Sequence, residues 1–203
     1  MKNLVISPHI DDEVLGCGGI LDKHSFVLEC GVDNFHVVSR DKRIQELEKA
    51  QELLGFDFEI LTNLVNNYEV PVLIDQLSDT INRIKPDKIF IPYPSYNQDH
   101  QAVYKASLIA LRPHDINFFV KKVLIYEQPH TFLWDHSYDL ATSFKPNYFV
   151  PIDIQKKKKA YSCLESQVRS FRSPALVEEL AAIRGRQSNS DFAEAFQTIR
   201  WVE

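Results

Sequence analysis

Residues 4–19 read LVISPHIDDEVLGCGG. The first three are apolar and predict a short buried strand of a parallel sheet. Ser7-Pro8 ends that strand, because proline has no N–H for a sheet ladder. One imidazole and three carboxylates follow within positions 9–13. Ligands of open α/β sheets bind at the carboxyl ends of the strands, so these side chains predict a functional site at the end of the first strand.

The spacing of the polar residues favours a metal site. His9 and Asp12 stand three residues apart on a turn, so both can reach one ion, and imidazole with carboxylate suits Zn²⁺. Asp11 lies beside a ligand but points elsewhere, which is where a general base acting on water should sit. The alternative is that Asp11 and Asp12 only cap the following helix, as acidic residues at a helix start often do.

This stretch resembles the signature of the LmbE-like, or PIG-L, zinc-dependent N-deacetylases. The resemblance rests on residues 8–13 and on the glycine-rich run 15–19, with Ile10 where the family usually has proline. It implies a Rossmann-like domain that removes acetyl groups from N-acetylglucosaminyl or related amides, with Zn²⁺ as cofactor. It also implies metal ligation by His9 and Asp12, catalysis by Asp11, and a supporting position behind the ligands for Glu13.

Composition and charge bound the remaining possibilities. The 203 residues are enough for one domain over 1–203. A net charge of −5 argues against a nucleic-acid partner, and no apolar run approaches the roughly 20 residues of a membrane span. The chain enters its first strand without a signal sequence, and its three cysteines have no paired spacing. Both features favour a cytoplasmic protein.

Strands alternate with amphipathic helices along most of the chain. This order predicts a single-domain, Rossmann-like α/β fold, with a mostly parallel sheet and helices on both faces. Residues 35–39 fit either an edge strand or a loop. The predicted strands are 4–6, 26–30, 56–61, 88–92, 120–127 and 149–152. The first predicted helix is short and ends at 20–24, and another begins at residue 100. The remaining predicted helices are 42–54, 72–84, 154–168 and 175–186.

A second polar stretch, residues 93–103, reads YPSYNQDHQAV. It follows the predicted strand 88–92, so it should face the same crevice as His9. His100 opens a helix there, and the positive end of the helix dipole disfavours protonation of the imidazole, which leaves it available to a metal. His100 is therefore the candidate third ligand.

The same resemblance covers this second stretch. The family has a His-x-Asp-His pattern, which here reads Asn97-Gln98-Asp99-His100. The resemblance implies that His100 binds the metal and that Asp99 orients it or its loop from behind. Asn97 replaces a histidine that stabilises the tetrahedral intermediate in the family. An asparagine can still donate to an oxyanion, but it cannot carry a proton at neutral pH.

Two further residues are candidates for the site. His130 lies just beyond the predicted strand 120–127 and is predicted to take over part of the task that Asn97 leaves open; the alternative is an exposed loop histidine. Arg43 lies on the predicted helix 42–54, where the resemblance implies that it binds sugar hydroxyls. Its alternative is a surface ion pair with Glu46, three residues along the helix.

The predicted function is a Zn²⁺-dependent amidohydrolase that removes acetate from a small N-acetylated sugar or glycoconjugate. One alternative is a catalytically impaired metal- or sugar-binding member of the fold, which Asn97 favours and Asp11 argues against. Another is a nucleotide-binding protein, but the glycines lack the G-x-G-x-x-G spacing. The sequence does not determine the specific substrate or the oligomeric state, and a homo-oligomer is possible.

Overall fold

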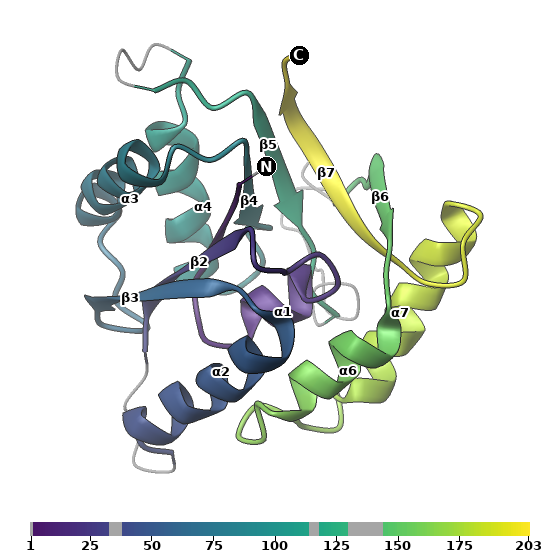
Figure 1. The fold of residues 1–203 in the computed structure, drawn as a ribbon. Coiled ribbons are helices and arrows are strands. Elements are labelled where there is room, and N and C mark those ends of the chain that lie inside the picture. Colours follow the sequence, from purple (N-terminus) through teal and green to yellow (C-terminus); the bar gives the residue numbers. More distant parts are fainter. Residues whose placement is uncertain (1, 33–37, 114–117, 130–143) are drawn as a thin grey trace.

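The computed structural model describes residues 2–32, 38–113, 118–129 and 144–203 (Figure 1). Its centre is a seven-stranded sheet in the order β3-β2-β1-β4-β5-β7-β6. The first five strands pair in parallel, and β7 is antiparallel to both β5 and β6. The strands are β1 Asn3–Ser7, β2 Ser25–Gly31, β3 Asp57–Asn63, β4 Lys88–Pro92, β5 Lys122–Tyr126, β6 Tyr148–Pro151 and β7 Ala193–Trp201.

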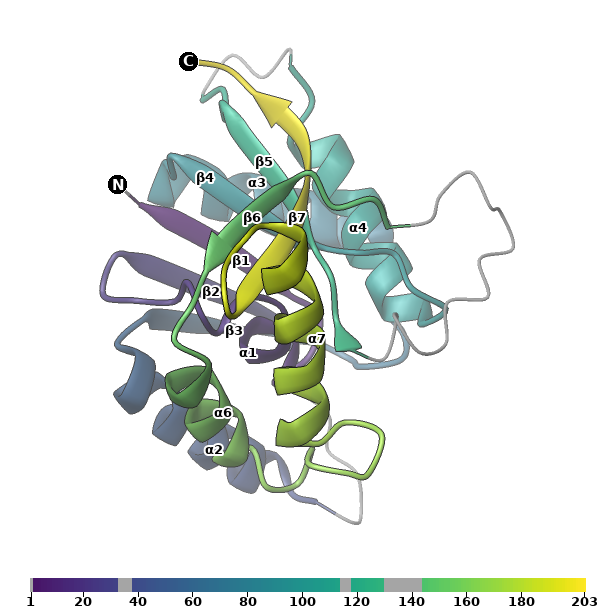
Figure 2. The ribbon, with the colours of Figure 1, turned by 90° about the vertical axis from the view of Figure 1, so that its right-hand side faces the viewer.

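Helices cover both faces of this sheet. On one face lie α1 (Asp12–Cys17), α2 (Arg40–Leu54), α6 (Ile154–Ser162) and α7 (Pro174–Gln187). On the other lie α3 (Val70–Ile84) and α4 (Gln98–Ala110). Figure 2 shows α7 running beside β6 and β7. Side chains alternate along β1, so that Val5 enters one core and Leu4 and Ile6 enter the other. The predicted α/β fold is confirmed.

Local sequence explains where α2 begins and ends. The hydroxyl of Ser39 accepts a hydrogen bond from the backbone N–H of Lys42, which caps the first turn. The helix ends at Leu54, and Gly55 follows it with a φ of 90°, a left-handed conformation that glycine adopts without strain. The helix predicted at 42–54 therefore begins two residues earlier, at Arg40.

The helix predicted at 154–168 is wrong in its second half. Helix α6 ends at Ser162, and the chain then turns and forms an isolated antiparallel bridge between Arg169 and Arg172. Leu164 is buried but lies outside the helix, just before the turn at 165–167, so its helical spacing does not report a helix. The Tyr161 hydroxyl donates to the carbonyl of Arg172 at 2.9 Å and holds the turn against α6.

Two other elements differ from the prediction. The short helix α1 ends at Cys17 and does not extend to 20–24. Strand β7 was not predicted, because its first half is buried without alternation and contains the weak strand formers Ala193, Glu194 and Ala195. The choice between edge strand and loop at 35–39 falls largely on residues outside the described ones.

The sheet reverses its winding at β1, which pairs with β2 on one side and with β4 on the other. Such a switch point opens a crevice at the carboxyl ends of the strands. Strand β1 leads into His9, and β4 leads into the loop before His100. The two polar stretches therefore meet at one place. In the described parts of the chain, no helix has the length and apolar character that crossing a membrane requires.

Candidate active site

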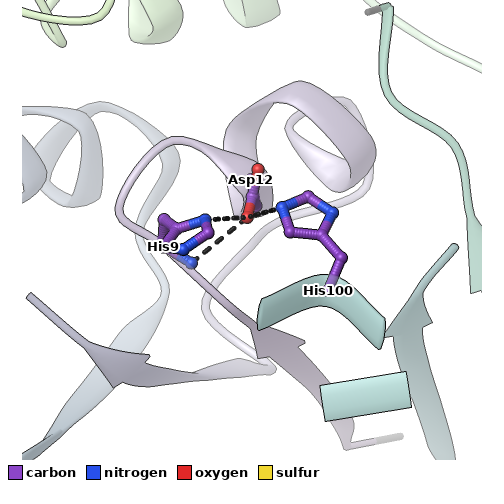
Figure 3. Close-up of side chains that lie close together, drawn as sticks. All are labelled: His9, Asp12 and His100. Atoms are coloured by element: carbon purple, nitrogen blue, oxygen red, sulfur yellow. Dashed lines mark hydrogen bonds and ion pairs between the residues drawn. The ribbon is translucent and has the colours of Figure 1, made fainter. Parts of the chain in front are cut away.

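Three side chains converge at the switch point: His9 after β1, Asp12 at the start of α1 and His100 in the first turn of α4 (Figure 3). The Oδ2 atom of Asp12 lies 3.3 Å from Nδ1 of His9 and 3.1 Å from Nε2 of His100. One donor atom from each residue lies within 4.8 Å of the others. Tetrahedral donors about 2.1 Å from one cation are roughly 3.4 Å apart, so the separations of 3.1 and 3.3 Å fit a shared ion.

Neighbouring side chains hold both imidazoles in orientation. Asp99 Oδ2 lies 2.9 Å from Nε2 of His9, which leaves Nδ1 facing Asp12. Ser95 Oγ lies 3.3 Å from Nδ1 of His100, which leaves Nε2 facing the same carboxylate. Metal-binding histidines usually have their second nitrogen held in this way by a carboxylate or another polar group.

The third donor is held similarly. Gln128, two residues after β5, donates a hydrogen bond from its side-chain nitrogen to Oδ1 of Asp12. The other carboxylate oxygen, Oδ2, faces the two histidines. Both Gln128 and Asp12 are buried, at 1% and 2% exposure, so water does not compete for this contact. Each of the three donors thus has one atom fixed by a neighbour and another directed at the common centre.

The charges at this centre favour the binding of a cation. Burial alone would lower the pKa of His9, but the carboxylates of Asp12, Asp99 and Asp11 outweigh it and raise this pKa to about 10. Burial opposes ionisation of Asp12, yet His100 and His9 hold its pKa well below the usual range. A metal ion would supply the positive charge that the proton on His9 supplies otherwise. One carboxylate and two imidazoles, with their outer atoms held, fit Zn²⁺.

Asp99 contacts His9, a different histidine from the one expected. The sequence predicted that it orients His100 or the surrounding loop, but its carboxylate contacts the ring of His9. The same oxygen also accepts a hydrogen bond from the backbone N–H of Asn66 at 2.7 Å. Asp99 therefore connects the α4 start to the first polar stretch and to the loop after β3.

We expect Asp99→Ala to weaken Zn²⁺ binding by about 10- to 100-fold, the usual loss when a partner of a metal ligand is removed. The reason is that the His9 ring loses the acceptor that fixes its orientation. Competition with a chromophoric chelator measures the affinity. Asp99→Asn keeps an acceptor oxygen and should lose less; an alanine variant that binds Zn²⁺ as tightly as the wild type would contradict this role.

Asp11 lies beside the three donors without belonging to them. Its backbone has a φ of 140°, and its side chain makes no capping hydrogen bond to α1, so the capping alternative is wrong for this residue. Its Oδ2 lies 2.9 Å from Nη1 of Arg172. Burial and the charge of Asp12 raise the pKa of Asp11 to about 7, against the lowering by Arg172 and Arg43. A buried carboxylate with a raised pKa is suited to proton transfer near neutral pH.

Glu13 stabilises the backbone of the first polar stretch. Its Oε2 accepts a hydrogen bond from the backbone N–H of Asp11 at 2.9 Å, and Ser7 Oγ lies 3.5 Å away. The residue is fully buried, and burial raises its pKa to about 8. Glu13 thus holds the turn that carries Asp11 in its unusual backbone conformation.

Arg43 also braces the motif. Its guanidinium donates to the carbonyl of Ile10 at 3.1 Å and to the Ser166 hydroxyl at 3.3 Å. Glu46 accepts hydrogen bonds from the backbone N–H and the hydroxyl of Ser166. Arg43 and Glu46 are each only 2% exposed, so the alternative of a surface ion pair is wrong.

A cavity of about 320 Å³ opens beside the three donors. Its volume is within the range of small-molecule sites. Asn97 lines it and also caps α4, because its Oδ1 accepts a hydrogen bond from the backbone N–H of Asp99 at 2.8 Å. His130 lies outside the described residues. The lining residues are His9, Asp11, Asp12, Arg43, Val65, Asn66, Tyr96, Asn97, His100, Gln167, Arg169, Phe171 and Arg172.

Sequence reasoning missed three residues that touch the site: Ser95, Gln128 and Arg172. The strand-end rule that selected His9 also applies to Ser95 after β4 and to Gln128 after β5, but neutral side chains give no sign of chemistry on their own. Arg172 reaches Asp11 across 161 positions of sequence. No local pattern signals that contact.

The chain has no match among family models or curated proteins, but solved structures share its fold. The conserved protein TT1542 from Thermus thermophilus superposes with a TM-score of 0.80 at 24% identity, over 100% of this chain and 96% of the other. The N,N'-diacetylchitobiose deacetylase from Pyrococcus horikoshii gives 0.77 at 20% identity, over 98% and 84%.

The neighbours do not all catalyse one reaction. Several are teicoplanin deacetylases. Another is GalB, the 4-carboxy-2-hydroxymuconate hydratase from Pseudomonas putida, with a TM-score of 0.75 at 22% identity over 100% of this chain and 99% of the other. At these identities the comparison establishes the fold, and the reaction has to be argued from the site. The resemblance read from the first motif is confirmed at that level: this chain has the fold of the LmbE/PIG-L deacetylases.

Proposed function

We propose that this protein is a Zn²⁺-dependent amidohydrolase that removes the acetyl group from a small N-acetylated sugar or glycoconjugate. The observation that carries the proposal is the position of Asp11, a buried carboxylate beside three converging donors but outside the donor set. A protein that only binds a metal has no need of such a base. The deacetylases of the same fold support the reaction class.

The proposed roles follow from the contacts. His9, Asp12 and His100 would hold Zn²⁺, which supplies a coordinated water of lowered pKa and polarises the amide carbonyl. Asp11 accepts the proton of the attacking water, and its bond to Arg172 fixes the carboxylate for that transfer. The same proton then goes to the amide nitrogen, because an amide anion is a very poor leaving group.

Asn97 is the proposed donor to the oxyanion. Its Oδ1 is occupied by the backbone N–H of Asp99, so its side-chain NH₂ is the part that a ligand in the cavity can use. Donors placed where negative charge develops stabilise a tetrahedral intermediate. Asn97 cannot deliver a proton, however, so the general acid is Asp11 with help from His130.

We expect His130→Ala to lower kcat by about 10²-fold, the low end of the contribution of a positioned acid. Asn97→His in the same background should restore part of the rate by returning a titratable ring to the cavity. Asn97→His should also lower the free energy of unfolding by about 1 kcal/mol through loss of the α4 cap. Stopped assays across pH and urea unfolding measure the two effects, and unchanged pH–rate behaviour in His130→Ala would show that this histidine takes no part.

Acetate release tests the proposed function. The Zn²⁺-loaded protein is incubated with a panel of N-acetyl sugars, and free acetate and free amine are measured together. The proposal requires equal amounts of both products, and it fails if the protein cleaves no member of the panel faster than the Asp11→Asn variant does.

The three cysteines are free thiols, which supports our expectation that the reaction takes place in the cytoplasm.

Asn97 favours one competing function, a catalytically impaired protein that binds a metal or a sugar without turnover. Such a protein would bind Zn²⁺ and N-acetyl sugars and would release no acetate. Measuring sugar binding and acetate release on the same preparation separates the two functions.

A further inference from the structure

The cavity carries more positive charge than the proposed reaction uses. Arg169 and Arg172 line it beside the carboxylates Asp11 and Asp12; Arg43 also lines it, but its guanidinium already donates to the Ile10 carbonyl and the Ser166 hydroxyl. Asp12 faces the two histidines and Asp11 faces Arg172, so both carboxylates already have partners. A bound Zn²⁺ would add to the excess. The chain as a whole has a net charge of −5, so this local excess runs against the overall charge.

Arg172 has donors beyond those that Asp11 uses. A guanidinium has five N–H donors in a planar fork. Nη1 of Arg172 bonds to Asp11, while Nε is buried without an acceptor among the described residues. An unpartnered buried donor is unfavourable unless a ligand or water provides the acceptor. Arg172 can therefore hold Asp11 and a second acceptor at once.

Arg169 has no carboxylate partner in the described parts of the chain, although it lines the same cavity. Its backbone pairs with that of Arg172 through two hydrogen bonds of 3.1 and 2.9 Å. Directly opposed residues of an antiparallel bridge place their side chains on one face. Both guanidinium groups thus approach the cavity from one hairpin, which Tyr161 anchors to α6.

The ring of Phe171, between these arginines, is 51% exposed and lines the same cavity. Its centroid lies 5.7 Å from the Arg172 guanidinium carbon. An exposed aromatic ring beside paired arginines offers a sugar ring an apolar surface next to a charged group. The hairpin therefore combines the contacts that a negatively charged sugar derivative requires.

We propose that Arg169 and Arg172 form an anion subsite, so that the sugar bound here carries a carboxylate or phosphate group next to its acetamide. The proposal rests on the proposed function for the acetamide and on the hairpin for the anion. Guanidinium groups bind both anions through paired N–H donors. Neutralising Asp11 would explain Arg172 alone and leaves Arg169 without a role.

Calorimetric binding measurements on the whole protein test the subsite. The ligands are N-acetylglucosamine, N-acetylglucosamine 1-phosphate, N-acetylmuramic acid and glucose 1-phosphate. At least one anionic N-acetyl sugar should bind 10-fold or more tightly than N-acetylglucosamine, and the two anionic N-acetyl sugars distinguish phosphate from carboxylate. Arg169→Gln should remove most of that preference, about 10- to 100-fold for one charge-assisted contact.

The matched control is Arg186→Gln, which removes one positive charge from an exposed position of α7 outside the cavity. It should leave the preference intact. Equal binding of neutral and anionic sugars, or equal losses in Arg169→Gln and Arg186→Gln, would overturn the subsite. Glucose 1-phosphate lacks the acetamide, so an Arg169-dependent affinity for it supports the subsite even if no acetate is released. Acetate release without any anion preference would retain the reaction and reject the subsite.

Discussion

Asp11→Asn is expected to lower kcat by about 10²- to 10⁴-fold and to leave Zn²⁺ affinity nearly unchanged. The asparagine has the same shape and can still accept a hydrogen bond from Arg172, but its amide cannot take up the proton of the attacking water. The backbone φ of 140° also favours this variant over most others, because asparagine tolerates positive φ better than bulky residues do. Metal binding should be unaffected because Asp11 lies outside the proposed donor set.

Metal content by mass spectrometry and acetate release, measured on one preparation, separate the two effects. Asp41→Asn is a suitable control, since it removes an exposed carboxylate from the first turn of α2. That variant should match the wild type in both measurements. A loss of Zn²⁺ together with activity in Asp11→Asn would mean that Asp11 and Asp12 exchange roles.

His100→Ala is expected to weaken Zn²⁺ binding by more than the roughly 100-fold that marks the loss of an outer partner. It removes Nε2, one of the three donors around the centre, from a position that is 2% exposed. Activity should fall with the metal. The stabilisation by Zn²⁺ should fall as well, because a ligand at 100 times its Kd raises the free energy of unfolding by about 2.7 kcal/mol.

Thermal unfolding with and without Zn²⁺ measures this loss directly, and it does not depend on knowing the substrate. His24→Ala is the matched control, because His24 is exposed and lies at the opposite end of the strands, before β2. The control should keep the full Zn²⁺-induced rise in Tm. A His100→Ala protein that is stabilised by Zn²⁺ as much as the control would remove His100 from the proposed ligands.

The positions of His9, Asp12 and His100 could be predicted because each follows from local signals. An apolar run and a proline mark the end of a strand, and parallel strands place their carboxyl ends at one edge of the sheet. The same reasoning placed six of the seven strands near their observed bounds. Strand β7 was not predicted by this reasoning, because burial of both faces of its first half removes the alternation that marks a half-exposed strand.

Contacts between distant segments could not be predicted in this way. The resemblance implied that Asp99 orients His100 or its loop, yet the fold brings His9 to its carboxylate. The contact of Arg172 with Asp11 could not be predicted for two reasons. The two residues are far apart in the chain, and the helical spacing of Leu164 and Val168 suggested a longer α6. Where tertiary packing overrides local periodicity, single-sequence reasoning fails.

The hairpin at 169–172 lies between α6 and α7 in the chain, whereas the three proposed metal donors lie on the segments after β1 and β4. Under the roles proposed above, the metal donors and the anion subsite thus belong to separate stretches of the chain, which the contact between Arg172 and Asp11 connects. Such modularity lets one stretch diverge while the other is held constant. Exchanging residues 169–171 for the corresponding turn of another protein of this fold, while keeping Arg172 for its contact with Asp11, is therefore a direct route to change the ligand preference without rebuilding the proposed metal centre.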